Sequence, residues 1–589
     1  MRLARRFLPL LLLCTAAPAF AAAVDADGAF RAITEREWAW RLQDAPQFAT
    51  SVGVHDYDDQ LGHVDAASQA RRLATLRGVQ RELDALDVAA LSPAQRVNYA
   101  VYRAQIDNAV EDLRLHGWLM PLTSDSSFYA DLAFLPRTHP FGSVRDVENY
   151  LRRLAAIPAY FDEHIALLRQ GVKEGRTLPR VVLTGREQPL RDVAELKDPT
   201  DSVFYAPLKQ LPAGIPAAEA ERLRGEAQRV LREAVIPAHA RLLKYFVEDY
   251  VPHARRSIAA TALPDGKAWY RQQIREYTTL DLTPEAIHAI GLKEVARIRA
   301  EMEAVMREAK FDGDFAAFLA FLRRDPQFYA STPEELMLRA RDIAKRIDGK
   351  LPAYFGLLPR LTYGVEPVPE AIAPFYTGGR YVPAAVGGKE AGTYWVNTYD
   401  LPSRPLYVLP ALTLHEAVPG HHLQGALAAE QGEQPPFRRY SYISAYGEGW
   451  ALYAEHLGVE MGIYRTPYEH FGRLTYEMWR AGRLVVDTGM HALGWSRERA
   501  VAFLRDNTAL STHEIDTEVD RYISWPGQAL SYKLGELKIR ELRARAEQAL
   551  GDRFDLRAFH DAVLSLGSVP LPLLEQHIDA WIAQRRSAG

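Results

Sequence analysis

Two stretches in the second half of the chain carry residue types that could bind a metal ion and hydrolyse an amide. Leu414–Gln424 reads LHEAVPGHHLQ, and Tyr446–His456 reads YGEGWALYAEH. A helical zinc-protease site needs two neutral imidazoles on one face, a carboxylate that takes a proton from the attacking water, and a third ligand from elsewhere. His415 and Glu416 fit the first ligand and the general base.

The second histidine of this pattern is displaced. The usual position, four residues after the first, is Pro419. Because proline removes a backbone donor and clashes with the preceding turn, we expect a local bulge that brings His421 to the second ligand position. His422 is the competing choice. In an unbroken helix it would share the face of His415 but lie about 10 Å along the axis, which is long for one metal.

The second stretch supplies two glutamates, Glu448 and Glu455. We predict Glu448 as the third ligand. Glu455 is two helical turns further on the same face, where it could hold a ligand histidine by a hydrogen bond. A single His-Glu pair is weak evidence, and the alternative is a set of solvated helix acids with a core histidine. The joint pattern, with apolar residues such as Trp450 around the acids, is more specific.

These stretches, with WPGQALSYKLGELK at Trp525–Lys538, resemble a bacterial secreted family called domain of unknown function 885. The resemblance covers most of the mature chain. More distantly, the glutamate pair is similar to that of thimet-type oligopeptidases, and the Trp525 segment is similar to the tyrosine-bearing segment of Taq-type metallocarboxypeptidases. Those families imply a mostly helical zinc peptidase. The inserted Pro-Gly departs from their plain HExxH.

The resemblance also implies a role for Tyr532. Amide hydrolysis passes through an oxyanion, which a phenol can stabilise beside a metal. A buried packing tyrosine is the alternative. Gln528 lies one turn earlier and is a candidate for binding substrate. Asp487 and His491 stand one turn apart and could orient a transition-state donor, although a plain core pair would look the same.

Before the His415 stretch, between Leu361 and Leu409, the composition changes to prolines, glycines and aromatic residues, and this segment is a candidate for binding substrate. Gly392–Asp400, GTYWVNTYD, is typical of a short strand. In the families that the chain resembles, such an edge pairs with an extended substrate, and Tyr394 and Asn397 could face it. Arg380 follows a Gly-Gly pair and could meet a substrate carboxylate. An ordinary surface loop is the alternative for each residue.

Residues 1–23 have the basic head, apolar run and small residues of a secretory signal peptide. We therefore expect a periplasmic or secreted protein. Cys14 is the only cysteine and lies in this signal, so the mature fold would have no disulfide. A lipid anchor is not favoured, because Leu13 before Cys14 is not the small residue that lipoprotein processing prefers.

The composition fits a large globular protein. Its 589 residues are 48% hydrophobic, and the formal net charge is only -4 at pH 7. No later run of about 20 apolar residues predicts an integral membrane segment, and the interspersed charges do not suggest nucleic acid. We divide the mature chain into a helical region, 24–264, and a metallopeptidase-like catalytic region, 265–589. The sequence does not indicate an oligomeric state.

Helix start signals recur along both regions, so we predict a mainly α fold with a short β segment beside the metal helices. Serine or threonine caps stand before a helix at Ser92, Ser143, Thr283 and Thr332, three of them followed by proline. The favoured function is a zinc-dependent peptidase acting on peptides or small proteins. One alternative is a metal-dependent hydrolase of another amide or ester. The other is an inactive peptide-binding protein of the envelope, which is less favoured because such a protein needs no base like Glu416 beside the first ligand.

Overall fold

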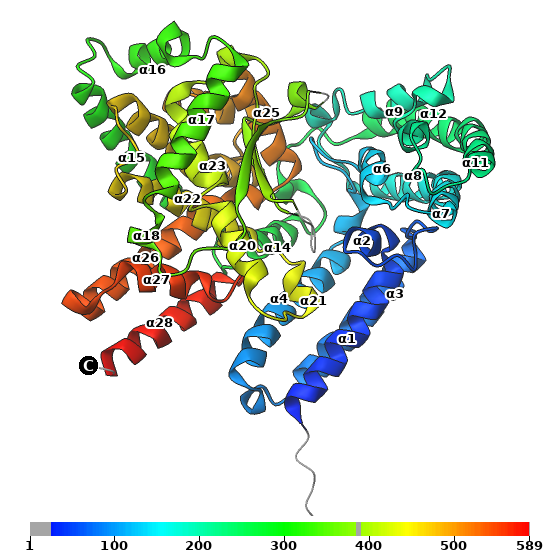
Figure 1. Ribbon diagram of the computed structural model, residues 1–589, viewed down its shortest axis with the longest axis horizontal. Helices are drawn as coiled ribbons and strands as arrows, with labels where there is room; N and C mark the ends of the chain where they lie inside the picture. Colours follow the sequence, from blue (N-terminus) through cyan, green and yellow to red (C-terminus); the bar gives the residue numbers. More distant parts are fainter. Residues whose placement is uncertain (1–24, 371, 385–389, 588–589) are drawn as a thin grey trace, which may run out of the picture.

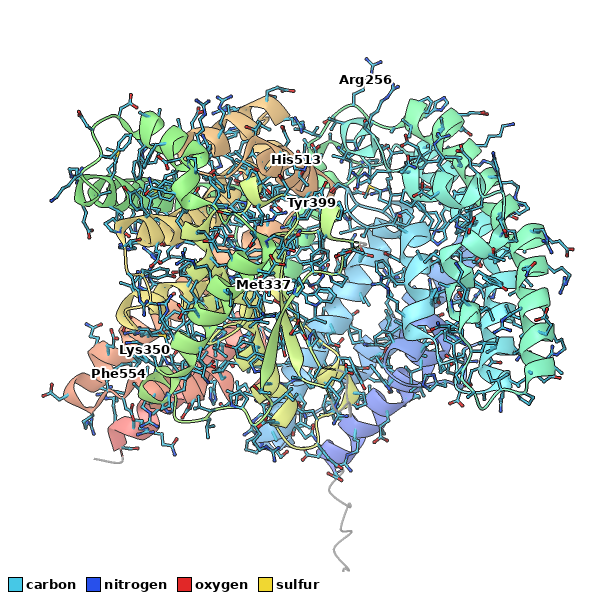
Figure 2. All side chains as sticks on the ribbon, turned by 45° about the horizontal axis from the view of Figure 1, so that its top comes forward. Arg256, Met337, Lys350, Tyr399, His513 and Phe554 are labelled. Atoms are coloured by element: carbon cyan, nitrogen blue, oxygen red, sulfur yellow. The ribbon has the colours of Figure 1, made fainter. Side chains whose placement is uncertain are left out.

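The structure, a computed structural model, describes residues 25–370, 372–384 and 390–587 (Figure 1). Helices make up most of it, and the described strands form one small sheet, which confirms the predicted mainly α fold. Side chains fill the space between these elements (Figure 2). The predicted signal peptide and Cys14 lie outside the described residues.

The first half of the chain forms two helical groups side by side (Figure 1). Its main helices are α1 (Ala26–Asp44), α3 (Ala66–Asp84), α4 (Pro93–Arg114), α7 (Val144–Ala155), α8 (Ile157–Glu174), α9 (Gln188–Ala194), α11 (Ala217–Val230) and α12 (Ile236–Tyr245).

The second half surrounds two long packed helix pairs, α15 with α23 and α22 with α26. Its main helices are α14 (Gly266–Thr278), α15 (Pro284–Glu308), α16 (Phe315–Arg324), α17 (Pro333–Asp348), α19 (Leu409–Glu416), α20 (His421–Glu430), α21 (Pro436–Arg439), α22 (Ser444–Glu460), α23 (Pro467–Ala492), α24 (Arg497–Asn507), α25 (Thr512–Ser524), α26 (Ser531–Leu550), α27 (Leu556–Leu564) and α28 (Leu571–Ser587).

The predicted helix starts are confirmed by their caps. Ser92, Thr283 and Thr332 each accept a hydrogen bond from a backbone N–H in the first turn, and proline occupies the first helical position after each. Ser143 forms a complete capping box with Asp146. Local side-chain chemistry therefore sets where these helices begin.

The sheet has the strand order β1-β3-β2, with β1 (Tyr363–Pro367) parallel and β2 (Gly379–Val382) antiparallel to β3 (Gly392–Val396). The predicted strand at residue 392 is thus confirmed as β3, although it is the central strand. In the described part of the chain, β2 has no strand on its outer edge, and it lies next to α19. This arrangement places a sheet edge beside the helix that carries His415.

The hydrophobic core crosses the sequence boundary drawn near residue 264. One cluster of buried residues joins side chains of the first half, such as Phe161 and Leu242, to side chains of the second, such as Phe318 and Val485. A second cluster packs around α19, α20 and α22 and includes Leu414, Leu423, Trp450 and Leu457. Burial of this apolar surface fixes α19 and α20, which carry the candidate histidines, against their neighbours.

A buried ion cluster joins α15, α23 and α26. The ammonium of Lys533, fully buried, lies 2.8 Å from Glu477 and from Glu536 and 3.2 Å from Glu294. Burial opposes ionisation of Glu477, yet Lys533 and Arg473 hold its pKa well below the usual range. The cluster is therefore charged in the folded protein.

Replacing Lys533 by methionine should destabilise the fold by about 3–5 kcal/mol, because it leaves buried carboxylates without their shared cation. Thermal unfolding followed by circular dichroism measures the change. Lys538→Met on the same helix is the matched control, since Lys538 pairs with Glu541 and Glu575 near the surface. Equal melting temperatures for the two variants would contradict the prediction.

Candidate metal centre

The two predicted metal-site histidines lie on either side of a helix break. α19 ends at Glu416 and α20 begins at His421. A Cβ on Gly420 would lie 1.9 Å from the carbonyl oxygen of His415, so only glycine allows this return of the chain. The indole N–H of Trp450 donates to the Pro419 carbonyl at 2.8 Å and holds the break against α22.

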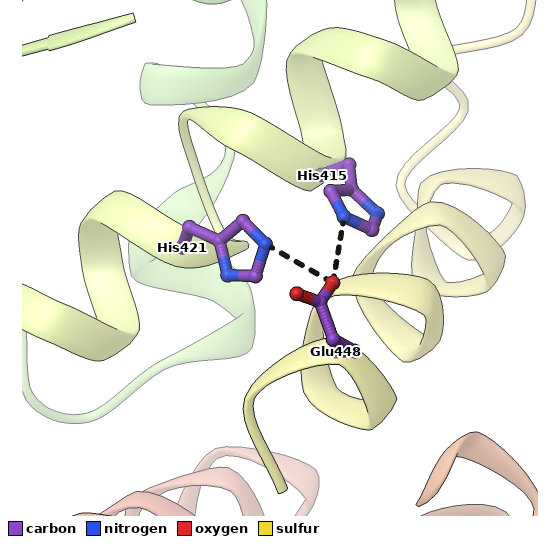
Figure 3. A group of neighbouring side chains, drawn as sticks. All are labelled: His415, His421 and Glu448. Carbon is purple, nitrogen blue, oxygen red and sulfur yellow. Dashed lines mark ion pairs between the residues drawn. The ribbon is translucent and has the colours of Figure 1, made fainter. Parts of the chain in front are cut away.

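The break turns His421 toward His415, and Glu448 of α22 faces both (Figure 3). The Nε2 atoms of His415 and His421 lie 3.4 Å and 3.5 Å from the same oxygen, Oε2 of Glu448. Tetrahedral zinc with bonds of ~2.1 Å separates its ligand atoms by ~3.4 Å. Each histidine nitrogen therefore lies as far from the Glu448 oxygen as two ligands of one zinc ion would lie from each other, and the three residues form a candidate metal centre.

The centre is partly exposed to solvent. His415 is buried, whereas the side chains of His421 and Glu448 remain 16% and 14% exposed. A catalytic metal site needs such an opening, because water and substrate must reach the metal. A structural site would be closed on all sides.

Glu455 holds the first histidine. Its Oε1 accepts a hydrogen bond from Nδ1 of His415 at 2.8 Å, which leaves Nε2 to face Glu448. Burial would lower the pKa of His415, but Glu448 and Glu455 raise it to about 10. The surrounding carboxylates therefore favour positive charge at this point, as a metal centre requires.

Glu416 lies beside the ligands with one oxygen fixed. The backbone N–H of Tyr381, in β2, donates to Oε2 of Glu416 at 2.8 Å. His422 supports the same strand. Its Nε2 donates to the carbonyl of Leu361, so its Nδ1 accepts from the Tyr381 hydroxyl, both at 3.1 Å. His422 therefore supports the strand that holds Glu416 and does not join His415 and His421 at the candidate metal centre.

Two tyrosines lie near the centre. The hydroxyl of Tyr442 donates to Oε1 of Glu448 at 2.9 Å, and the amide of Gln528 approaches the Tyr532 hydroxyl at 3.5 Å. Glycine makes this close assembly possible, since a Cβ on Gly449 would lie 2.5 Å from the backbone of Gly535. The contact brings α26, which carries Tyr532, against the ligand helix.

Asp487 and His491 are fully buried, and their hydrogen bonds go to other groups rather than to each other. Asp487 accepts from the Tyr270 hydroxyl and the Gly527 N–H, and His491 donates to the Tyr522 carbonyl at 2.9 Å. Burial raises the pKa of Asp487 to about 7. The pair therefore holds the end of α25 and the turn before α26, and neither residue reaches the ligands.

The four predicted substrate-binding residues fall into different places. Tyr394 and Asn397 are fully buried, and the Asn397 amide binds backbone carbonyls of the segment before β2, so neither side chain faces a substrate. Tyr394 lies on the face of β3 that packs into the second buried cluster, and Asn397 follows the end of the strand. Arg380 is exposed on β2, and Gln528 lies beside Tyr532.

Three residues that contact the site were not predicted from the sequence. Tyr442 precedes its helix, and only its position six residues before Glu448 could have suggested it. Tyr381 acts through its backbone N–H, which leaves no sequence signal. Arg480, on α23, lies 3.8 Å from Glu455 on the neighbouring helix α22.

A second group, His63, Asp65 and Glu163, also has ligand-like spacing. It lies on the surface, and its carboxylates already have partners: Asp65 caps α3, and Glu163 accepts from the Val64 N–H. These hydrogen bonds explain the group without a metal.

A family model described as "Bacterial protein of unknown function (DUF885)" matches residues 46–578. The chain belongs to this family. Membership of DUF885 was predicted from the sequence and is confirmed, and the match includes the candidate metal centre and the helices of the first half from α3 onward. The comparison with curated proteins gave no match.

Two solved structures are similar over nearly the whole DUF885 chain. The "putative lipoprotein" from Colwellia psychrerythraea is 26% identical, with 95% of this chain and 100% of that chain covered and a TM-score of 0.88. A "putative lipoprotein of unknown function" from Shewanella oneidensis is 19% identical, covers 93% and 99%, and has a TM-score of 0.68, a likeness of fold alone. Within the described ranges, no helix is long and apolar enough to cross a bilayer.

Proposed function

We propose that this protein is an exported, zinc-dependent peptidase that hydrolyses peptide bonds of peptides or small proteins. The observation that carries the proposal is the convergence of two imidazole nitrogens on one carboxylate oxygen, at 3.4 Å and 3.5 Å, in a partly exposed site with Glu416 beside them. Zinc bound by His415, His421 and Glu448 would supply a Lewis acid for water and carbonyl.

In this proposal the residues around the metal have separate roles. Glu416 takes a proton from the attacking water and returns it to the leaving amine. The Tyr381 N–H keeps that carboxylate in place. Glu455 keeps Nδ1 of His415 protonated, and so keeps its Nε2 available. Tyr532 donates a hydrogen bond from its hydroxyl to the oxyanion.

The edge strand supports a peptide as substrate. Among the described strands β2 has a free edge, and its Tyr381 N–H donates to the Glu416 carboxylate. An extended chain lying along this edge would pass the base and the ligands, in the manner of strand addition. A small non-peptide amide would make no use of such an edge.

The test is cleavage of a diverse synthetic peptide pool by the purified mature protein, read by mass spectrometry. We expect products from the zinc-loaded protein, none after chelation, and recovery when zinc is returned. Absence of products from protein with one bound zinc would reject peptide hydrolysis and favour a non-peptide amide or ester.

Replacing Tyr532 by phenylalanine should lower kcat by about 10²–10³-fold with little change in KM, because the hydroxyl acts mainly in the transition state. Tyr442→Phe is the comparison. Since Tyr442 binds a ligand oxygen, its loss should weaken metal affinity by about 10–100-fold. A larger kcat loss in Tyr442→Phe, at unchanged metal affinity, would assign the donor role to Tyr442.

A further inference from the structure

A cavity of about 160 Å³ lies between the two halves of the chain, outside the candidate metal centre. α4 and the segment after it supply one part of the wall, and α14 and the end of α25 supply another. None of the three candidate metal ligands lines it. Met120, Thr123 and Trp525 belong to the lining and are partly exposed, so the cavity is not sealed from solvent.

One wall carries a carboxylate without a partner. Asp112, on α4, lines the cavity, and its side chain makes no hydrogen bond or ion pair with any described residue. Burial raises the pKa of Asp112 to about 6. Burial and the charge of Asp112 together raise the pKa of Glu276, on α14, to about 7. An ammonium group beside Asp112 would offset this burial of negative charge.

Arg255 lines the same cavity and has no acidic partner. Its guanidinium donates to the backbone carbonyls of Thr177, Ser257 and Ala259, and it forms no ion pair within the described part of the chain. Burial lowers the pKa of Arg255 to about 10, so the group stays charged at neutral pH. Its Nη2 has no hydrogen-bond acceptor in the described ranges, and an incoming carboxylate can pair with it.

Two neutral polar groups of the lining are also unpaired. Gln273 and Trp269, both on α14, are buried, and neither the Gln273 amide nor the Trp269 indole N–H has a hydrogen-bond partner among the described residues. Buried polar groups normally find partners. Water could pair with the neutral groups, but it brings no charge to match Asp112 and Arg255. The cavity therefore fits a ligand that carries both a positive and a negative group.

We infer that this cavity binds a small zwitterionic α-amino acid, with its ammonium group at Asp112 and its carboxylate at Arg255. The two residues do not pair with each other, so one molecule with both charges matches both. The volume selects a short side chain, because an engineered cavity of roughly 150 Å³ binds benzene, and glycine and alanine are close to benzene in size. The inference does not depend on the proposed peptidase function.

Isothermal titration calorimetry of the purified mature protein with L-alanine tests the site. Ethylamine is alanine without the carboxylate, and propionate is alanine without the ammonium group. Each should bind at least about tenfold more weakly than alanine, because one buried charge of the protein stays unmatched. L-leucine should also bind at least about tenfold more weakly, since its longer side chain overfills the cavity.

Asp112→Asn should lower the affinity for alanine at least about tenfold, because an amide does not attract the ammonium group as a carboxylate does. The variant should melt no earlier than wild type, since Asp112 has no partner to lose and the amide removes a buried charge. Asp107→Asn is the matched control on α4. Asp107 pairs with Arg103 near the surface, and its variant should bind alanine as wild type does.

Amino acids can also bind zinc directly, so Glu448→Ala protein is titrated in parallel and should keep the wild-type affinity for alanine. Binding lost in Glu448→Ala but kept in Asp112→Asn would place the amino acid at the metal centre and overturn the inference. Equal affinities for alanine, ethylamine and propionate would overturn it too. So would no binding of alanine at millimolar concentration, which would leave the cavity to water. Failure of the peptide-pool test would leave these results unaffected.

Discussion

Glu416→Gln should lower kcat/KM for a cleaved peptide by about 10²–10⁴-fold while the bound metal stays at the wild-type level. An amide has the size of the carboxylate and its oxygen still accepts from the Tyr381 N–H. It cannot take a proton from water. The ligands His415, His421 and Glu448 are unchanged, so the loss measures the base alone.

The matched control is Glu433→Gln, in the exposed loop between α20 and α21. Initial rates across substrate concentrations, with metal analysis of each protein, give the comparison. If Glu416→Gln retained more than a tenth of wild-type kcat/KM at full metal content, another group would have to be the base.

Glu448→Ala should reduce metal affinity by at least about 100-fold, because loss of an outer-shell partner alone typically costs 10–100-fold. Its Oε2 is the oxygen that both histidines face, and no other described carboxylate completes this group. Activity at a fixed, limiting zinc concentration should disappear. Excess zinc should restore only part of it.

Metal analysis after dialysis against a weak chelator measures this loss. Glu460→Ala is the control on the same helix, since Glu460 pairs with Arg543 at the surface and such pairs contribute only about 0–1 kcal/mol. Unchanged metal content and activity in Glu448→Ala would remove Glu448 from the ligand set.

Much of the site follows from local sequence chemistry. Proline and glycine at 419 and 420 end one helix and permit the next, so the break between His415 and His421 was predictable. Seven-residue spacing put Glu448 and Glu455 on one helix face. The capped helix starts and the mainly α class depended likewise on residues close together in the chain.

Other parts depended on contacts between distant segments. His421 rather than His422 faces Glu448, because the whole of α20 is set by packing against α22 and by the Trp450 hydrogen bond. Tyr394 and Asn397 were expected at a substrate edge, but β3 is the central strand, and packing against the core and against the segment before β2 buries both side chains. Strand order has no signature in a single strand.

The residue types, the family and the helical class were thus determined by the sequence alone, because caps, periodicity and ligand spacing act within a few residues. Only the tertiary structure decided which histidine joins Glu448, that a backbone N–H of β2 fixes the base, and that Arg480 of α23 lies beside Glu455. Those arrangements need segments from β2 to α26 to pack together, and the free energy that aligns them comes from burial of side chains far apart in the chain.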